Sequence, residues 1–414
     1  MTAPMSSAAR LDLDRIRQEF PALASGFVFL DNAGGSQTLR GVAERVTDYL
    51  LHTNVQLGAS YAVSQTSTAR VLDARIATAA YVGAADPGEV VLGPSTTQLI
   101  DNLALAMEGT LAPGDEIVVT NADHHANVGA WQRLAKRGVV VKTWEIDPVT
   151  LRLEERALIP LLGPRTRLVA FSHATNLLGS IHDVRRLTQV VHEHGARVCV
   201  DGVAYAPHRA IDVAAWDVDY YVFSFYKVYG PHLAVLYGKR DALDALDTIN
   251  HEFIGRELPY KLQPGNVNFE LAHGLGGLYA YVEVLGGKTA AFDAFADQEE
   301  RLAERLLAWL RDRANVTIHG EPTGDRERRV PTISFTVAGL SPEAVVRAVD
   351  PHRVGIRHGD FYAKGLVRTL GVAERGGVVR VSMVHYNTES EIDRLIEALG
   401  TVITTSAGER HALE

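Results

Sequence analysis

Near its middle the chain reads Asp219-Tyr-Tyr-Val-Phe-Ser-Phe-Tyr-Lys227-Val-Tyr-Gly-Pro-His-Leu-Ala-Val-Leu-Tyr-Gly238, which is two apolar runs joined by a polar turn. Short apolar runs rich in aromatic and β-branched residues and separated by Gly-Pro predict two buried strands. Lys227 lies in the turn, so its amine is held close to the end of a buried strand. Burial lowers the pKa of a lysine and frees the amine as a nucleophile toward a carbonyl. A surface lysine after a strand is the alternative when the turn is taken alone.

Further strands precede this stretch, with helical segments between several of them. One such segment, Val184 to His194, carries its apolar residues on one face and ends before Gly195. Strands that alternate with helices predict an α/β fold with a mainly parallel sheet covered by helices, and ligands collect at the carboxyl ends of its strands. The predicted strands are Val90–Leu92, Glu116–Thr120, Val139–Trp144, Arg167–Phe171, Arg197–Val200 and Asp219–Phe223.

The pattern changes after about residue 240. A long amphipathic helix begins near Ala290 and is followed by alternating strands and helices, which predicts a smaller α+β domain. The strands expected there are Val316–Ile318, Thr332–Val337 and Gly377–Ser382, and the helices are Ser341–Val349 and Glu389–Leu399.

Composition excludes several classes of function. With 414 residues, 46% of them hydrophobic, the chain can bury a large core in more than one domain. A net charge of -9 leaves no basic footprint for nucleic acid. No apolar run is long enough to span a bilayer, and one cysteine excludes an intrachain disulfide. We therefore expect a soluble cytoplasmic protein with no nucleic-acid or membrane partner.

Several strand ends carry residues suited to an anionic, aromatic ligand. Thr96 and Thr97 stand where a strand leads into a helix, and a helix N-terminus favours a phosphate, although an ordinary N-cap is the alternative. The imidazole of His124 can lie over an aromatic ring; a metal site there lacks an apparent third ligand. Asp201 ends a strand, and Arg380 can bind a carboxylate through two parallel hydrogen bonds or pair with an acidic neighbour.

The stretch around the lysine closely resembles the cofactor-lysine segment of the class V aminotransferase family of pyridoxal-phosphate enzymes, which includes the cysteine desulfurases. Ser224, Tyr226, Lys227, Gly230 and Pro231 fill the places of that motif, with Tyr where desulfurases usually carry His. The resemblance implies a fold type I enzyme whose cofactor, pyridoxal 5'-phosphate, is linked to Lys227.

The resemblance also implies the contacts of the cofactor ring. The segment with His124 and His125 resembles one whose first His stacks on the ring, and Asn176 takes the place of an Asn that bonds the phenolic oxygen. Asp201 would keep the ring nitrogen protonated, so that the ring draws electrons from the substrate. Val203 would pack under the ring, while Ala204 stands where desulfurases have Gln.

The phosphate contacts implied by the resemblance come from two subunits. Thr96, Thr97, Ser224 and Tyr226 belong to the same chain as the lysine. Asn266, in a loop that resembles "Gly-Thr-Pro-Asn", would reach the phosphate of the partner subunit. This implies a homodimer with shared active sites.

The substrate side is implied by the two ends of the chain. Arg380 lies in a segment resembling "Val-Arg-x-Ser" and would hold the carboxylate of an amino-acid substrate, with Arg357 and His358 as second candidates. Asn32 and Ala33 lie in a segment that resembles "Leu-Asp-Asn-Ala-Ala", which lines the substrate side of the pocket. Tyr362 is a further substrate-side candidate, and His358 or Tyr362 could act as an acid.

The resemblance runs from about Phe29 to Leu399, and it implies that the N-terminal segment packs with the small domain. The expected division is a large cofactor-binding domain at 29–250, a connecting and dimer-facing segment at 251–285, a small domain made of 1–28 and 286–403, and a loosely held tail at 404–414.

The reaction is constrained by one absence from the sequence. Desulfurases carry a catalytic cysteine in a loop whose counterpart here, Gly355 to Ala363, has none. The one cysteine, Cys199, lies two residues before Asp201 in a predicted strand, roughly 6 to 7 Å deeper, and is expected in the core. With Lys227, His124 and Asp201 as catalytic residues, we expect a carbon–sulfur lyase acting by β-elimination. An aminotransferase, an amino-acid epimerase and a non-catalytic scaffold are the alternatives, and the sequence does not identify the amino acid.

Overall fold

The larger part of the protein is built on a seven-stranded sheet. The structure is a computed structural model that describes residues 11–411, with side chains to residue 403. The strand order is β2-β8-β7-β6-β5-β3-β4, and β8 runs antiparallel to both neighbours while every other pair is parallel. The strands are β2 (Val90–Gly93), β3 (Glu116–Thr120), β4 (Val140–Trp144), β5 (Thr166–Ser172), β6 (Arg197–Asp201), β7 (Tyr220–Ser224) and β8 (Ala234–Gly238).

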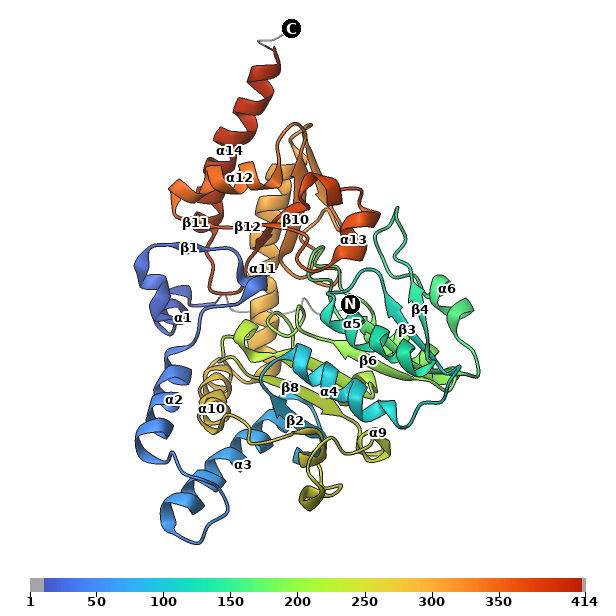
Figure 1. Ribbon diagram of the computed structural model, residues 1–414. Coiled ribbons are helices and arrows are strands. Elements are labelled where there is room, and N and C mark those ends of the chain that lie inside the picture. Colours follow the sequence, from blue (N-terminus) through green and yellow to red (C-terminus); the bar gives the residue numbers. More distant parts are fainter. Residues whose placement is uncertain (1–10, 412–414) are drawn as a thin grey trace, which may run out of the picture.

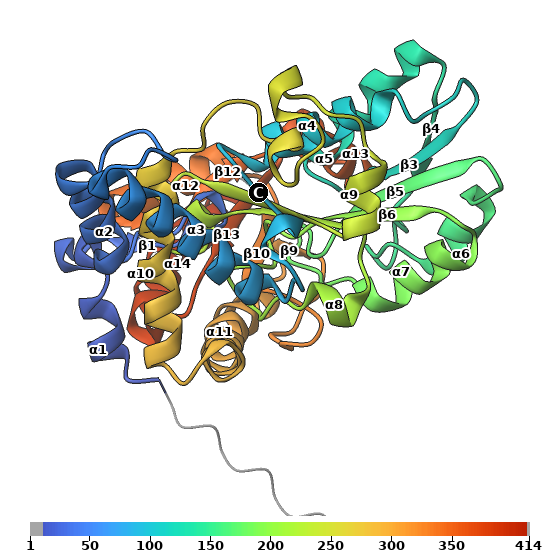
Figure 2. The ribbon, with the colours of Figure 1, turned by 90° about the horizontal axis from the view of Figure 1, so that it is seen from below.

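Helices cover both faces of this sheet, as Figure 2 shows with α4 and α5 on one side and α7 and α8 on the other. One buried apolar cluster joins one sheet face to α4 (Thr96–Glu108), α5 (Ala126–Arg133) and α9 (Arg240–Ala245). A second joins the other face to α3 (Ala62–Val82), α7 (Val184–Glu193), α8 (Val213–Trp216) and α10 (Phe269–Val284). Burial on both faces explains why the strands read as continuous apolar runs. The α/β fold predicted from the sequence is confirmed.

A smaller domain lies above the large sheet in the view of Figure 1. Its antiparallel sheet has the order β12-β13-β10-β9. Its apolar side packs against α11, α12 and α14. These strands are β9 (Val316–His319), β10 (Thr332–Val337), β12 (Arg357–Gly359) and β13 (Val378–Ser382); the helices are α11 (Lys288–Arg311), α12 (Pro342–Val349) and α14 (Glu389–His411).

The N-terminal segment contributes to this smaller domain. After α1 (Leu13–Gln18), β1 (Val28–Phe29) pairs in parallel with β11 (Val354–Gly355). The remaining helices are α2 (Arg40–His52), α6 (Glu155–Leu158) and α13 (Lys364–Thr369). The sequence predicted a loose tail at 404–414, but α14 continues through most of this segment, to His411. A helix extends readily once it has started, because each added residue gains one hydrogen bond.

The predicted connecting segment, 251–285, contains a long helix of its own. Helix α10 packs against α2, where the two backbones come so close that a Cβ at Gly277 would lie 2.4 Å from the carbonyl carbon of Gly41. Only glycine permits this approach. Within the described residues, no helix is both long enough and apolar enough to cross a membrane.

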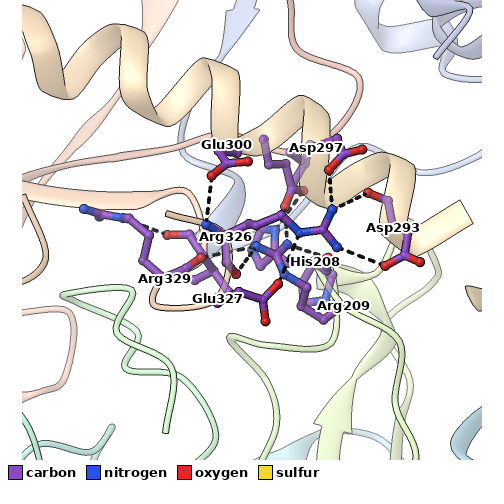
Figure 3. Close-up of polar contacts among 12 residues, drawn as sticks. His208, Arg209, Asp293, Asp297, Glu300, Arg326, Glu327 and Arg329 are labelled. Atoms are coloured by element: carbon purple, nitrogen blue, oxygen red, sulfur yellow. Dashed lines mark hydrogen bonds and ion pairs between the residues drawn. The ribbon is translucent and has the colours of Figure 1, made fainter. Parts of the chain in front are cut away.

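Polar and charged side chains join the two domains in an interdomain ionic cluster made of His208, Arg209, Glu299, Arg326 and Arg329. Figure 3 labels His208, Arg209, Arg326 and Arg329 of this cluster. Glu299 on α11 accepts hydrogen bonds from His208 Nδ1 (2.9 Å) and from Arg209 Nη1 (3.0 Å). Arg209 Nη2 donates to the carbonyl oxygens of Arg326 and Arg329. Because His208 and Arg209 follow β6 closely in the chain, the cluster fixes the strand-end loop after Asp201 against α11.

Candidate active site

A pocket opens at the carboxyl ends of the parallel strands. It is lined by every residue that the sequence predicted to contact the cofactor within one chain: Thr96, Thr97, His124, Asn176, Asp201, Val203, Ser224, Tyr226 and Lys227. Ala204 and Ser172 line it as well. A second pocket, between α1, α2 and α10, contains none of the predicted site residues.

Lys227 is held by the tight turn between β7 and β8. The carbonyl of Phe225 accepts hydrogen bonds from the N–H groups of Val228 and Gly230, and Tyr229 takes a left-handed conformation with φ of 60°. Burial and the nearby Arg380 lower the pKa of Lys227 to about 8, although Asp201 and Asp31 oppose this shift. About a tenth of the amine is therefore unprotonated at pH 7, far more than for an ordinary lysine, which suits a nucleophile or a base.

Asp201 stands at the end of β6 and is nearly fully buried. Its Oδ1 accepts a hydrogen bond from the N–H of Val203 (2.9 Å). Burial raises the pKa of Asp201 to about 6, and the neighbouring carboxylate of Asp123 adds to this shift. Such a buried carboxylate is stabilised in its charged form by a cationic N–H partner.

Of the two adjacent histidines after β3, only His124 lines the pocket. Its Nδ1 accepts a hydrogen bond from the N–H of Ala126, which leaves the proton on Nε2. Burial and Lys227 lower the pKa of His124 to about 4, so the ring is neutral near pH 7. His125 instead lies against Gly129 on the first turn of α5, and its backbone N–H donates to the carbonyl of Tyr362.

The N-terminus of α4 forms another wall of the pocket. Ser95 caps this helix by accepting a hydrogen bond from the N–H of Gln98. Thr96 Oγ1 and Ser224 Oγ are 2.7 Å apart, which ties the helix to the end of β7. Hydroxyl groups at the positive end of a helix dipole form an anion site. Tyr226 stacks in parallel on His232, with ring centroids 5.0 Å apart.

Arg380 reaches the site from β13 of the small domain. Its side chain is buried, Nη1 donates to the carbonyl of Asn176 (3.1 Å), and Nη2 donates to Asp31 Oδ1 (2.9 Å). The ring of Phe361 lies 3.8 Å from its Cζ, and its Nε has no hydrogen-bond partner. Asn176 Nδ2 donates to the carbonyl of Phe361, while its buried Oδ1 also has no partner.

The predicted residues of the N-terminal segment are used differently from the expectation. Asn32 is buried, and its Nδ2 donates to the carbonyls of Phe29 and Ser382. Its Oδ1 accepts a hydrogen bond from the hydroxyl of Tyr386. Both ends of the amide are therefore used to join β1 to β13. Ala33 contributes its backbone N–H to Ser382. The neighbouring Asp31, which was not among the predicted site residues, is the residue that reaches Arg380. Its place as the carboxylate within the predicted substrate segment was the signal available.

The substrate-side candidates on β12 and in the following loop also lie in different surroundings. Arg357 is paired with Arg380 across the strands, whereas His358 is paired with Val379, so the alternation of side chains puts His358 on the opposite face from Arg380. This argues against His358 as a substrate ligand. Tyr362 is exposed, with its ring centroid 5.2 Å from that of His124. Asn266 is exposed outside the pocket and donates to Gln56 Oε1.

The pocket's donor set fits pyridoxal phosphate. Hydroxyl groups and a helix N-terminus suit the phosphate, a buried carboxylate suits a protonated ring nitrogen, and a lysine with a lowered pKa suits the aldehyde. The unpaired Oδ1 of Asn176 is a buried polar atom that a ligand in the pocket can satisfy.

Known proteins are similar to this chain over most of its length. The family described as aminotransferase class V matches residues 28–395. The chain is similar to the aminotransferase-like protein FGM3 of Gibberella zeae, with 44% identity over 406 residues that cover 96% of this chain and 100% of that protein. It is also similar to the cysteine desulfurase-like protein ustD of Aspergillus flavus, with 33% identity over 95% of this chain and 91% of that protein.

Solved structures agree with these sequence relatives. The apo structure of a cysteine desulfurase from Thermococcus onnurineus superimposes with a TM-score of 0.87 and 26% identity, over 97% of this chain and 100% of that one. The cysteine desulfurase CsdA of Escherichia coli gives a TM-score of 0.83 and 28% identity, over 95% of this chain and 99% of that one. With the lysine pocket and the match over residues 28–395, the chain belongs to the class V aminotransferase family and is a pyridoxal-phosphate-dependent enzyme.

Proposed function

We propose that Lys227 carries the cofactor and that the surrounding pocket orients it. Asp201 would pair with the ring nitrogen, and His124 and Val203 would hold the ring between them. Asn176 serves the phenolic oxygen. Hydroxyl groups at the start of α4, at the end of β7 and in the turn after β7 would hold the phosphate, from Thr96, Thr97, Ser224 and Tyr226. Once bound, pyridoxal phosphate withdraws electrons from the bonds at the substrate's α-carbon.

The reaction that we propose is β-elimination from a sulfur-containing amino acid, which makes the protein a carbon–sulfur lyase. Arg380 holds the α-carboxylate, Lys227 removes the α-proton, and the bond from Cβ to sulfur breaks. Tyr362 is the residue that we assign to return a proton to the departing sulfur. Its exposed side chain beside His124 supports this assignment.

The observation that carries this proposal is the position of Cys199. It is the one cysteine in the chain, and it is fully buried between α-helices and the sheet, on β6. Burial raises the pKa of its thiol well above the ordinary value, so a thiolate is disfavoured there. A persulfide relay needs an accessible thiolate, and an elimination does not.

An aminotransferase is the second candidate. The name of the Gibberella zeae relative, an aminotransferase-like protein, favours it. Lys227 would then deliver the proton taken from the α-carbon to the aldehyde carbon of the cofactor, and no bond at Cβ would break. Epimerisation would need the proton to return to the opposite face of the α-carbon.

A product assay separates these reactions. The purified protein is loaded with pyridoxal phosphate, and its visible absorption spectrum is recorded before and after addition of single amino acids. Pyruvate, sulfide and ammonia formed from L-cysteine, in amounts that match one another, support the lyase. A cofactor converted to its amine form without these products supports the aminotransferase and refutes the lyase.

We further propose a homodimer in the cytoplasm. Asn266 lies outside the pocket of its own chain, and α3 exposes Leu72 and Ile76 beside Arg75, whose guanidinium contacts Tyr260. This apolar surface and the loop with Asn266 would meet a second copy. Light scattering at micromolar concentration should give twice the mass of the chain, and a monomer would refute the shared site.

A further inference from the structure

Arg380, whose guanidinium we assign to the substrate carboxylate, is paired with a carboxylate of its own chain. Asp31 Oδ1 lies 2.9 Å from Arg380 Nη2, and the side chain of Asp31 is 30% exposed while that of Arg380 is 4% exposed. Arg380 Nη1 is bound to the carbonyl of Asn176, so its Nη2 is the group that Asp31 takes. A substrate carboxylate entering here meets a like charge at short range.

A second guanidinium lies on the other side of Asp31. Arg357 on β12 is directly opposite Arg380 on β13, and like charges in that position are destabilising unless an anion compensates them. Asp31 supplies this anion, because its Oδ2 is 3.7 Å from Arg357 Nη1. Arg357 is 57% exposed, so its long side chain is free to follow a moving partner.

The chain also leaves space beside Asp31. A Cβ placed on Gly34 would lie 3.1 Å from Asp31 Oδ2, which is tighter than ordinary packing. Gly34 does not have a positive φ, so its backbone does not require glycine. The family pattern that this segment resembles has alanine here. The missing methyl group therefore gives the carboxylate of Asp31 room to turn.

We propose that Asp31 occupies the carboxylate site of Arg380 in the absence of substrate, and that an arriving amino acid displaces it onto Arg357. The inference rests on the proposed substrate role of Arg380. The charges balance when the substrate is bound: two arginines and Asp31 leave one positive charge, which the α-carboxylate of the substrate neutralises. Asp31 and Arg357 are thus positioning residues that set how strongly a carboxylate binds.

The test measures binding to the cofactor-loaded enzyme by visible spectral titration, with two probes. L-Alanine carries a carboxylate, and ethylamine is a matched amine without one. We expect Asp31→Asn to bind L-alanine about tenfold more tightly, because the competitor is gone. Arg357→Gln should bind it about tenfold more weakly, because Asp31 then stays on Arg380. Arg357→Lys should behave as the wild type, since a cation remains.

The double variant decides the mechanism. With Asp31→Asn and Arg357→Gln combined, we expect the tight binding of Asp31→Asn alone, because there is no carboxylate left to move. Ethylamine should bind all four variants as it binds the wild type. If the double variant is as weak as Arg357→Gln, then Arg357 contacts the ligand itself and the displacement is refuted. Weaker L-alanine binding by Asp31→Asn also refutes it.

Failure of the proposed function gives a different result. A wild-type protein that shows no cofactor band, or no spectral response to either amine, overturns the proposed function and this inference together. A normal band, a normal response to ethylamine and unchanged L-alanine binding in every variant overturn the inference alone.

Discussion

Two members of the interdomain ionic cluster, Glu299 and Arg329, contrast with two residues of the candidate active site, Arg380 and Asn176. In the cluster, Glu299 is bound by His208 and Arg209, and the buried Arg329 donates to the carbonyls of Glu321, Leu178, Val330 and Thr332. At the candidate active site, Arg380 Nε and Asn176 Oδ1 are buried without partners. In the cluster, Arg326 Nε also has no hydrogen-bond partner, although it lies 3.4 Å from Glu327 Oε1. Buried polar groups are normally satisfied, so the pairing of Glu299 and Arg329 supports stability, and the unpaired atoms of Arg380 and Asn176 mark a place for a ligand.

The largest expected effect comes from removing the lysine amine. Lys227→Ala should lower turnover by at least about 1,000-fold and abolish the visible band of the bound cofactor, since the nucleophile and base is lost. Its stability should not fall, because no hydrogen bond to Nζ holds the fold in the described structure. Absorption spectra, product assays and thermal unfolding measure the three quantities.

A second buried lysine provides the matched control. Lys261 is fully buried, and its Nζ donates to the carbonyls of Asp244 and Leu246. Lys261→Met should reduce stability by about 1 to 3 kcal/mol, because it leaves those carbonyls unpaired, while the cofactor band remains. Turnover at the wild-type rate in Lys227→Ala would end the assignment of Lys227.

Breaking the interdomain ionic cluster should act on stability and not on the chemistry. Glu299→Gln leaves the Arg209 charge buried without its partner, so the free energy of unfolding should fall by about 3 to 5 kcal/mol. Turnover per folded molecule should change less than threefold. Urea unfolding of the purified variant gives the first quantity, and active-site titration gives the second.

Glu300 is the control for this change. It neighbours Glu299 on α11 but is only half-buried, and it accepts one long hydrogen bond from the N–H of Arg326 (3.4 Å). Glu300→Gln should cost less than about 1 kcal/mol. Equal losses for the two variants would show that pairing in the cluster is not what stabilises the junction.

The sequence predicted what depends on local patterns. Apolar runs located the strands of both domains, and the turn after β7 located Lys227, because strand propensity and Gly-Pro turns act over a few residues. The parallel sheet then required that residues at the strand ends share one edge, which brought Asp201 and His124 to the lysine pocket.

What the sequence did not predict depends on how the two domains meet. Asp31 and Arg380 are 349 positions apart, and Arg209 and Glu299 are 90 apart, so no local pattern relates them. Asn32 looked like a pocket residue but is taken up by backbone groups of the small domain. His358 directly follows Arg357, and because side chains alternate along a strand it lies on the opposite face of the small sheet from Arg380.

The pocket should also give the apoprotein a pH-dependent stability. The pKa of Asp201 is about 6 in the fold against an ordinary value of 3.8, so the fold favours the protonated form. That contribution is fully present below pH 4 and is lost as the pH rises through 6. Apo wild type should therefore lose up to about 3 kcal/mol relative to Asp201→Asn between pH 4 and 7.

Urea unfolding of both apoproteins across this range measures the difference. Loading with pyridoxal phosphate should reduce the stability difference between the wild type and Asp201→Asn at pH 7. A cationic ring nitrogen stabilises the charged carboxylate of Asp201 but not the amide side chain of the variant. Parallel stability curves for the two apoproteins would mean that Asp201 is already satisfied without a ligand, as Glu299 is. The contrast between pocket and cluster would then not hold for this carboxylate.

The smallest expected effect on turnover is at the one cysteine, where a substitution separates packing from chemistry. Cys199 is fully buried in the core between the sheet and α4, with a thiol whose pKa is raised by burial. Cys199→Ala should cost about 1 to 2 kcal/mol of stability and change turnover less than twofold. In the native protein a thiol reagent should react only after unfolding. A tenfold loss of turnover without loss of stability would mean that a persulfide forms on Cys199 after all, and an elimination that needs no thiol would be refuted.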